Sequence, residues 1–148
     1  ALSFPVRHVG GSFRIPITEI EVDYSTPWVR KTERCIDTAY MSSPFFEYYR
    51  DPLFAILDSC PRTLWELDMK LIGFFIAKIG LKTELVPTTS FDPSPLEIHP
   101  KKANTILQDY GLDRPYYQVF SSKHGFIPNL SVMDLLFNEG PESICCLL

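Results

Sequence analysis

The chain lacks long hydrophobic runs, an excess of positive charge and the signature motifs of common enzymes, and each absence excludes a class of protein. Its longest apolar run, Leu71 to Ala77, is far shorter than the roughly 20 residues of a membrane-spanning helix. A formal charge of −4 and a pI near 5.3 argue against binding to nucleic acid or to an anionic membrane, which requires a basic surface. The P-loop, GxGxxG, HExxH and GxSxG motifs are all absent, so the enzyme classes that carry them are not expected.

Metal-binding patterns are missing as well. The cysteines, Cys35, Cys60, Cys145 and Cys146, form no CxxC pair and have no histidine at the spacing of a zinc site. We therefore expect no metal ion, and the sequence leaves it unknown whether another cofactor is bound. The start of the chain has no basic segment followed by an apolar stretch, the pattern of a secretory signal. Together with the ordinary cysteine content, this predicts a cytoplasmic protein.

Length and composition predict one folded domain. A chain of 148 residues with 45% hydrophobic and 22% charged residues is typical of a globular protein. At this length, roughly 68–70% of the surface of the unfolded chain is buried on folding. We expect residues 1–148 to form a single domain with one core.

The most informative stretch is Arg114 to Pro141, which reads RPYYQVFSSKHGFIPNLSVMDLLFNEGP. Ser131 is a typical N-cap residue, and Asp134 three positions later predicts a variant of the capping box. The Gly-Pro pair at the end of the stretch supplies a stop signal. A helix is therefore predicted over about 132–137. Its buried face has the spacing i, i+3, i+4 and consists of Val132, Leu135 and Leu136.

Further helices are predicted from caps, prolines and apolar periodicity. The longest follows Pro61, because Thr63 and Glu66 have the spacing of a capping box and an apolar stripe runs on to Gly80. Gly73 within that helix indicates the close approach of another helix. The remaining helical stretches are residues 26–41, a new turn after Pro44, and residues 53–57 and 101–110.

Three short strands complete the prediction. Leu2 to Val6 and Ile15 to Val22 are rich in β-branched and aromatic residues and are separated by a glycine turn, and Thr83 to Val86 is a third candidate. Four prolines predict an extended surface loop over residues 87–100. The predicted fold class is α+β: a mostly helical single domain with a small antiparallel sheet near the N-terminus. Exposure of the first two strands predicts a homo-oligomer that forms through them.

Two stretches of the chain resemble the WbqC-like family, bacterial proteins found with genes for O-antigen and other surface polysaccharides. One is YYQVF followed by GFIPNLSVMDLLFNEGP, which resembles the C-terminal portion of family members. The other is Trp28 followed by ERCIDTAYMSSPFFEYY, which occurs in the same order. Together the two stretches extend the resemblance over most of the chain.

The resemblance also implies two departures from the family pattern. Family members begin with a further N-terminal portion that carries Gln-Pro and aromatic-Pro motifs, and this chain is expected to lack it. A histidine is expected four residues after the tryptophan, where this chain has Thr32. The departure at Thr32 puts a catalytic or ligand-binding role of that position in doubt.

Polar and aromatic side chains form one candidate site. A histidine beside a turn glycine suits general-base catalysis, and aromatic rings can stack on a sugar, although core packing is their commoner use. For Asn129 we prefer hydrogen bonding to the loop backbone, whereas for Gln118 ligand binding and backbone bonding are both open. The predicted site is concave, with catalytic His124 and the substrate-binding residues Tyr116, Tyr117, Gln118, Asn129, Phe45, Phe46, Tyr48 and Tyr49.

Two functions are left open. The resemblance implies an enzyme of surface-polysaccharide biosynthesis, a transferase that binds a sugar nucleotide or amino sugar and transfers an acyl or aminoacyl group. The alternative is a noncatalytic binding or structural module. The basic residues Arg30, Lys31 and Arg34 are interrupted by Glu33, and we interpret them as a solvated helix face rather than a phosphate site.

Overall fold

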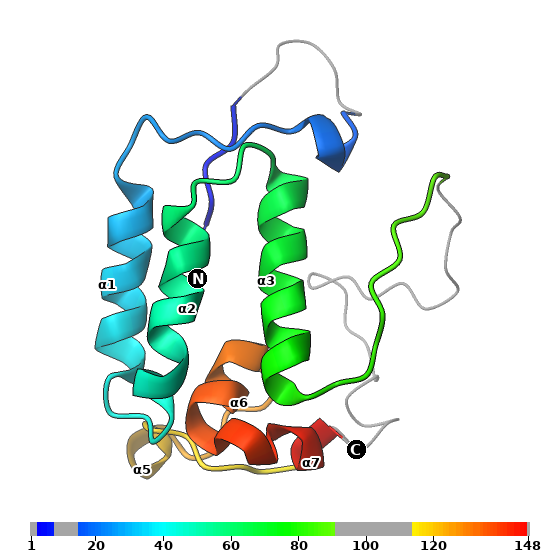
Figure 1. The fold of residues 1–148 in the computed structure, drawn as a ribbon. Coiled ribbons are helices and arrows are strands. Elements are labelled where there is room, and N and C mark those ends of the chain that lie inside the picture. Colours follow the sequence, from blue (N-terminus) through cyan, green and yellow to red (C-terminus); the bar gives the residue numbers. More distant parts are fainter. Residues whose placement is uncertain (1–2, 8–14, 91–113, 148) are drawn as a thin grey trace.

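The computed structural model describes residues 3–7, 15–90 and 114–147, and three long helices form its frame. These are α1 (Trp28–Tyr40), α2 (Phe46–Asp58) and α3 (Leu64–Ile79), which stand side by side in Figure 1. The helices at the lower end of the frame are α5 (Ser121–His124), α6 (Val132–Glu139), η2 (Gly140–Glu142) and α7 (Ser143–Leu147). At the upper end, η1 (Ile17–Glu19) contacts α3.

The start and end of α3 are determined by its own sequence. The Thr63 hydroxyl accepts a hydrogen bond from the Glu66 N–H (3.2 Å), and the Glu66 carboxylate accepts one from the Thr63 N–H (3.4 Å), so the predicted capping box is confirmed. Gly80 ends the helix at a φ of 83°, a left-handed conformation that suits glycine. The close helix approach expected at Gly73 is wrong for the part of the chain that the structure describes, because a Cβ there would meet no atom of another element within 4 Å.

A single helix, α2, replaces the two short ones expected over residues 44–57. It runs from Phe46 to Asp58 with Pro52 in its interior. Proline has no N–H to donate to the preceding turn, so packing must offset the missing hydrogen bond. The side chains that α2 buries in the core are Phe46, Leu53, Phe54 and Leu57.

Apolar side chains from α1, α2, α3 and α6 form the core. Its main cluster lies between the long helices and α6 and contains Ile36, Phe46, Leu53, Phe54, Phe74, Ile79, Leu136 and Phe137. A smaller cluster at the upper end contains Val22, Trp28, Leu57 and Leu67. The indole of Trp28 donates a 2.9 Å hydrogen bond to the Asp23 carbonyl and stacks on Tyr24. Residues 22–24 are thereby held against the start of α1.

The helix predicted over residues 132–137 is confirmed as α6, which extends to Glu139. The Ser131 hydroxyl caps it by accepting a 3.2 Å hydrogen bond from the Met133 N–H. The capping box expected from Asp134 does not form, because its carboxylate turns inward. Val132 stays exposed, and the buried side chains of α6 are Asp134, Leu135, Leu136, Phe137 and Asn138.

The antiparallel sheet predicted near the N-terminus is wrong, and the described part of the chain contains no strand. Only isolated bridges form, between Val6 and Val22 and between Glu21 and Thr63. Pro5 and Pro16 have no backbone N–H to donate to the hydrogen bonds between two strands. Residues 17–19 form the helix η1 instead of staying extended. The fold is therefore mostly helical rather than α+β.

The other strand-based expectations also change. Residues 83–86 have no strand pairing. A homo-oligomer was expected to form through the first two strands, and without them that expectation loses its basis. The predicted helix over residues 101–110 and most of the loop over residues 87–100 lie outside the described residues. Within the described ranges, no helix is long and apolar enough to cross a bilayer.

Candidate functional site

The segment before α6 is held together by Gln118. Its side-chain amide donates a 2.9 Å hydrogen bond to the Ile127 carbonyl, and its oxygen accepts a 2.9 Å bond from the Ile127 N–H. Gln118 is only 4% exposed, and both functional groups of its amide are used. Of the two interpretations left open for this residue, the structure supports hydrogen bonding to the backbone.

Two phenols approach the Asp134 carboxylate. Tyr116 donates a 2.7 Å hydrogen bond to it, and its ring packs edge-on against Phe126. Tyr40 of α1 also lies near this carboxylate: burial, and secondarily the Asp134 charge, raises the pKa of Tyr40 to about 12. Burial, and next the hydrogen bond to Asp134, raises the pKa of Tyr116 as well. These contacts connect residue 116 to both α1 and α6.

The other predicted residues of this segment are exposed. Tyr117 is 53% exposed, and His124 lies at the end of α5 with its N–H bonded to the Phe120 carbonyl. Asn129 has a φ of 58°, a left-handed conformation that asparagine tolerates better than most residues. The chain therefore turns at Asn129, and the preferred hydrogen bond of its side chain to the loop backbone stays a prediction.

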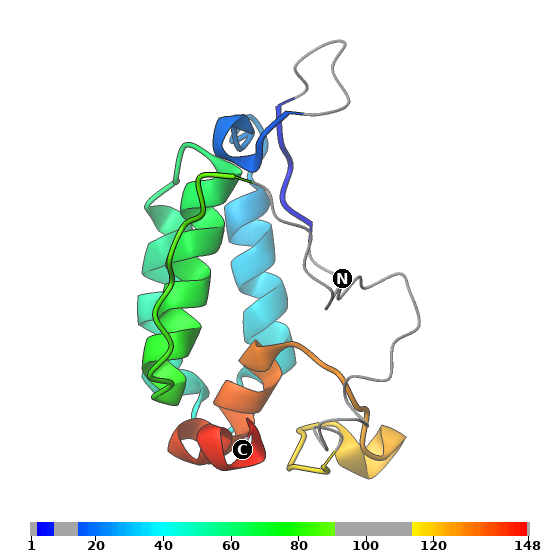
Figure 2. The same ribbon diagram turned by 90° about the vertical axis from the view of Figure 1, so that its right-hand side faces the viewer.

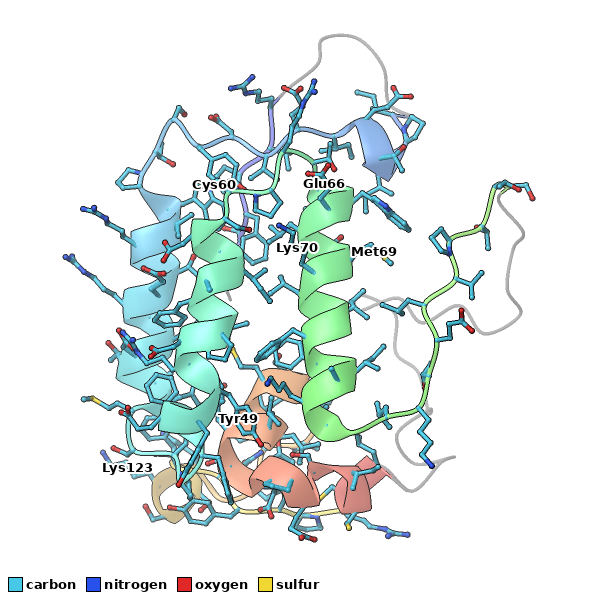
Figure 3. All side chains as sticks on the ribbon, in the orientation of Figure 1. Tyr49, Cys60, Glu66, Met69, Lys70 and Lys123 are labelled. Carbon is cyan, nitrogen blue, oxygen red and sulfur yellow. The ribbon has the colours of Figure 1, made fainter. Side chains whose placement is uncertain are left out.

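The aromatic run after α1 divides between core and surface. Phe46 is buried and packs edge-on against Phe137, whereas Tyr48 is 75% exposed. The ring of Phe45 lies against Gly140. The backbone N–H of Phe45 donates a 3.0 Å hydrogen bond to the Phe137 carbonyl. Tyr49 packs against the core near the lower end of α2, as Figure 3 shows. The prediction that these rings and His124 share one site stays a prediction.

A hollow of about 760 Å³ lies along one side of α1, at the basic residues that we interpreted from the sequence as a solvated helix face rather than a phosphate site. The exposed basic side chains of Arg30, Lys31 and Arg34 line it from α1, and Phe120, 49% exposed, lines it from the segment before α5. We call this the basic hollow; its remaining lining residues are Pro27, Cys35, Thr38 and Ala39. The spacing i, i+1, i+4 of the basic residues was a signal that they share a helix side.

A second cavity, of about 730 Å³, lies on one side of the long helices. Residues 3–7 and the segment leading into α6 lie on this side of the helices in Figure 2. We call it the apolar groove; its lining residues are Phe4, Thr32, Cys35, Ile36, Ala39, Tyr40, Leu53, Leu57, Leu71, Phe75, Leu130, Ser131 and Met133. Thr32 is only 5% exposed and borders the groove at the position where the resemblance led us to expect a histidine.

The structure gives no indication of metal chemistry in the part it describes. No group of three or more His, Cys, Asp or Glu side chains among these residues is placed to hold a metal ion. All the cysteines are free thiols, and Cys35 is exposed on α1, where it borders both the basic hollow and the apolar groove.

One comparison with known proteins identifies the chain. The model of the WbqC-like protein family matches residues 1–114, which include Trp28 and the stretch ERCIDTAYMSSPFFEYY. The stretches YYQVF and GFIPNLSVMDLLFNEGP lie beyond this match, so the resemblance to the C-terminal portion of family members is not part of it. No curated protein and no solved structure matches the chain. Because the family match covers well over half of the residues, the chain belongs to the WbqC-like protein family.

Proposed function

We propose that this WbqC-like protein binds a sugar nucleotide, through its diphosphate, in the basic hollow, and acts as a transferase in surface-polysaccharide biosynthesis. The observation that carries the proposal is the grouping of Arg30, Lys31 and Arg34 around one cavity with the exposed ring of Phe120. Guanidinium and ammonium groups are the usual protein partners of phosphate oxygens. An aromatic ring can stack on a nucleobase.

The size and charge of the cavity support this ligand class. A volume of about 760 Å³ lies within the range of roughly 300–1,000 Å³ that small-molecule sites occupy. The protein as a whole carries a formal charge of −4, so a surface with three neighbouring cations stands out from its average. Such a local group attracts an anion even though the net charge is negative.

The direct test is calorimetric titration with UDP-glucosamine, with inorganic pyrophosphate as a second probe. We expect Arg34→Gln to weaken binding of both probes. Phe120→Ala should weaken the binding of UDP-glucosamine but not that of pyrophosphate, because only the nucleotide has a base. The matched control is Lys78→Gln, which removes an exposed cation from α3, away from the basic hollow. Equal effects of Arg34→Gln and Lys78→Gln would contradict the proposal.

The alternative function is a noncatalytic binding or structural module. A thermal-shift panel of nucleotide-linked amino sugars separates the two, since a ligand at 100 times its dissociation constant stabilises the folded state by about 2.7 kcal/mol. A shift with one amino sugar supports the proposed function. The absence of any shift across the panel would favour the noncatalytic module.

A further inference from the structure

The apolar groove and the basic hollow are neighbours on α1. At 3.6 residues per turn, Thr32 and Ile36 point towards the groove, while Arg30 and Arg34 point away from it. Cys35 and Ala39 fall between these directions and line both cavities. A ligand that occupied the groove could therefore place one end beside the cations of the basic hollow.

The groove lining excludes most polar ligands. Among the described residues, its side chains are apolar except for the Cys35 thiol and three hydroxyls, which belong to Thr32, Tyr40 and Ser131. A peptide segment lying in it would need partners for its backbone N–H and C=O groups, and this lining supplies few. A hydrocarbon chain needs no such partners and is stabilised by the burial of its apolar surface.

We propose that the apolar groove binds the aliphatic chain of an acyl group, with its carboxyl or ester end at Cys35 and Ala39. Charge complementarity determines this orientation, because Lys31 and Arg34 lie in the hollow that shares those two residues. Leu130, just before α6, also lines the apolar groove. Along α1, the groove residues Thr32 to Tyr40 span about 12 Å, at a rise of about 1.5 Å per residue.

This inference deepens the proposed function and rests on it for its biological meaning. An acyl chain in the groove and an amino sugar nucleotide in the basic hollow would meet at Cys35 and Ala39, the residues common to both cavities. The groove would then select the acyl chain of an ester donor: the sugar amine would attack the ester carbonyl, the amide bond would form as the ester C–O bond breaks, and the alcohol would leave with the proton of the amine. Binding of the chain itself can be measured without any nucleotide, so the two proposals fail separately.

Titration of the protein with decanoate tests the site. We expect binding, and we expect Leu130→Glu to weaken it at least about tenfold, because a carboxylate in the apolar lining opposes burial of the hydrocarbon chain. The matched control is Ile127→Glu: Ile127 is 43% exposed and Leu130 is 42% exposed on the same segment, but Ile127 does not line the groove. Its affinity for decanoate should stay within about twofold of the unmodified protein.

The orientation has its own test. Lys31→Gln should weaken the binding of decanoate about two- to fivefold, because it removes an exposed charge pair, and should leave the binding of decanol unchanged. Absence of decanoate binding, or equal losses in Leu130→Glu and Ile127→Glu, would overturn the acyl site. Decanol binding as tight as that of decanoate, unaffected by Lys31→Gln, would show a neutral apolar occupant and overturn it as well. If Leu130→Glu leaves the binding of UDP-glucosamine intact, the basic hollow binds its ligand independently of the apolar groove.

Discussion

The phenol of Tyr116 donates a 2.7 Å hydrogen bond to the carboxylate of Asp134, which is 6% exposed. The two residues are 18 positions apart, so this bond ties the segment before α5 to the buried side of α6. Removal of the phenol should leave a buried carboxylate short of a donor. We expect Tyr116→Phe to lower the free energy of unfolding by about 1–3 kcal/mol, measured by urea denaturation. An unchanged urea midpoint would show that water or Tyr40 replaces the lost donor.

The same cluster predicts a loss of stability at high pH. In the unfolded chain, Tyr40 and Tyr116 have pKa values near 10, and the folded state raises both, that of Tyr40 to about 12. The folded state thus keeps protons that the unfolded state releases, so this contribution is complete below about pH 10 and is lost as the pH rises towards about 12. We expect urea midpoints to fall over that interval. The fall should be shallower in Tyr40→Phe. If the urea midpoint falls as steeply in that variant as in the unmodified protein, Tyr40 does not cause the loss of stability.

Gly140 cannot carry a side chain without moving Phe45. A Cβ built on Gly140 would lie 2.5 Å from the Phe45 ring, and its φ of 54° is unfavourable for other residues. We expect Gly140→Ala to destabilise the protein by about 2–5 kcal/mol, the sum of backbone strain and overpacking. Gly80→Ala is the matched control, because Gly80 also has a positive φ, but a Cβ there would meet no atom of another described element within 4 Å. It should lose only about 1–2 kcal/mol, and similar thermal melting of the two variants would contradict the steric argument.

Substitutions of Gln118 and His124 should distinguish a structural role from a catalytic role in the segment between residues 114 and 130. Gln118→Ala removes both hydrogen bonds to Ile127, so we expect a loss of about 1–3 kcal/mol and faster hydrogen exchange of the Ile127 amide. His124→Ala changes an exposed side chain and should alter stability by less than about 0.5 kcal/mol. If turnover is found, loss of activity in His124→Ala at normal stability would support the predicted catalytic role. Equal stability losses in the two variants would show that His124 is structural.

Pro52 interrupts the hydrogen bonding of α2. We expect Pro52→Ala to raise the free energy of unfolding by about 1–2 kcal/mol, because the restored N–H can bond within the helix and the ring no longer crowds the preceding turn. Glu47→Ala, at an exposed position in the same helix, is the control and should stay within about 0.5 kcal/mol. Lower stability in Pro52→Ala would mean that the proline is stabilising through the unfolded state.

Sequence reasoning was accurate where a few neighbouring residues decide the structure. Thr63 with Glu66, Gly80 and Ser131 mark the helix ends where they were expected, because caps and stops depend on groups within about four positions. It failed for the strands near the N-terminus, since β-branched content favours an extended chain but cannot supply a partner strand. Family membership was also readable from local motifs, although the matched residues are 1–114 rather than the C-terminal stretch.

The candidate sites depended on contacts between residues far apart in the chain. Sequence determined that Gln118 has donors and acceptors and that Arg30, Lys31 and Arg34 share one side of α1. Only the tertiary structure decided that Gln118 bonds to Ile127, that Asp134 turns to Tyr116 instead of capping α6, and that Phe120 lies across the basic hollow. The physical reason is that a side chain's donors, charge and periodicity are local properties, whereas the groups it meets are chosen by the packing of helices.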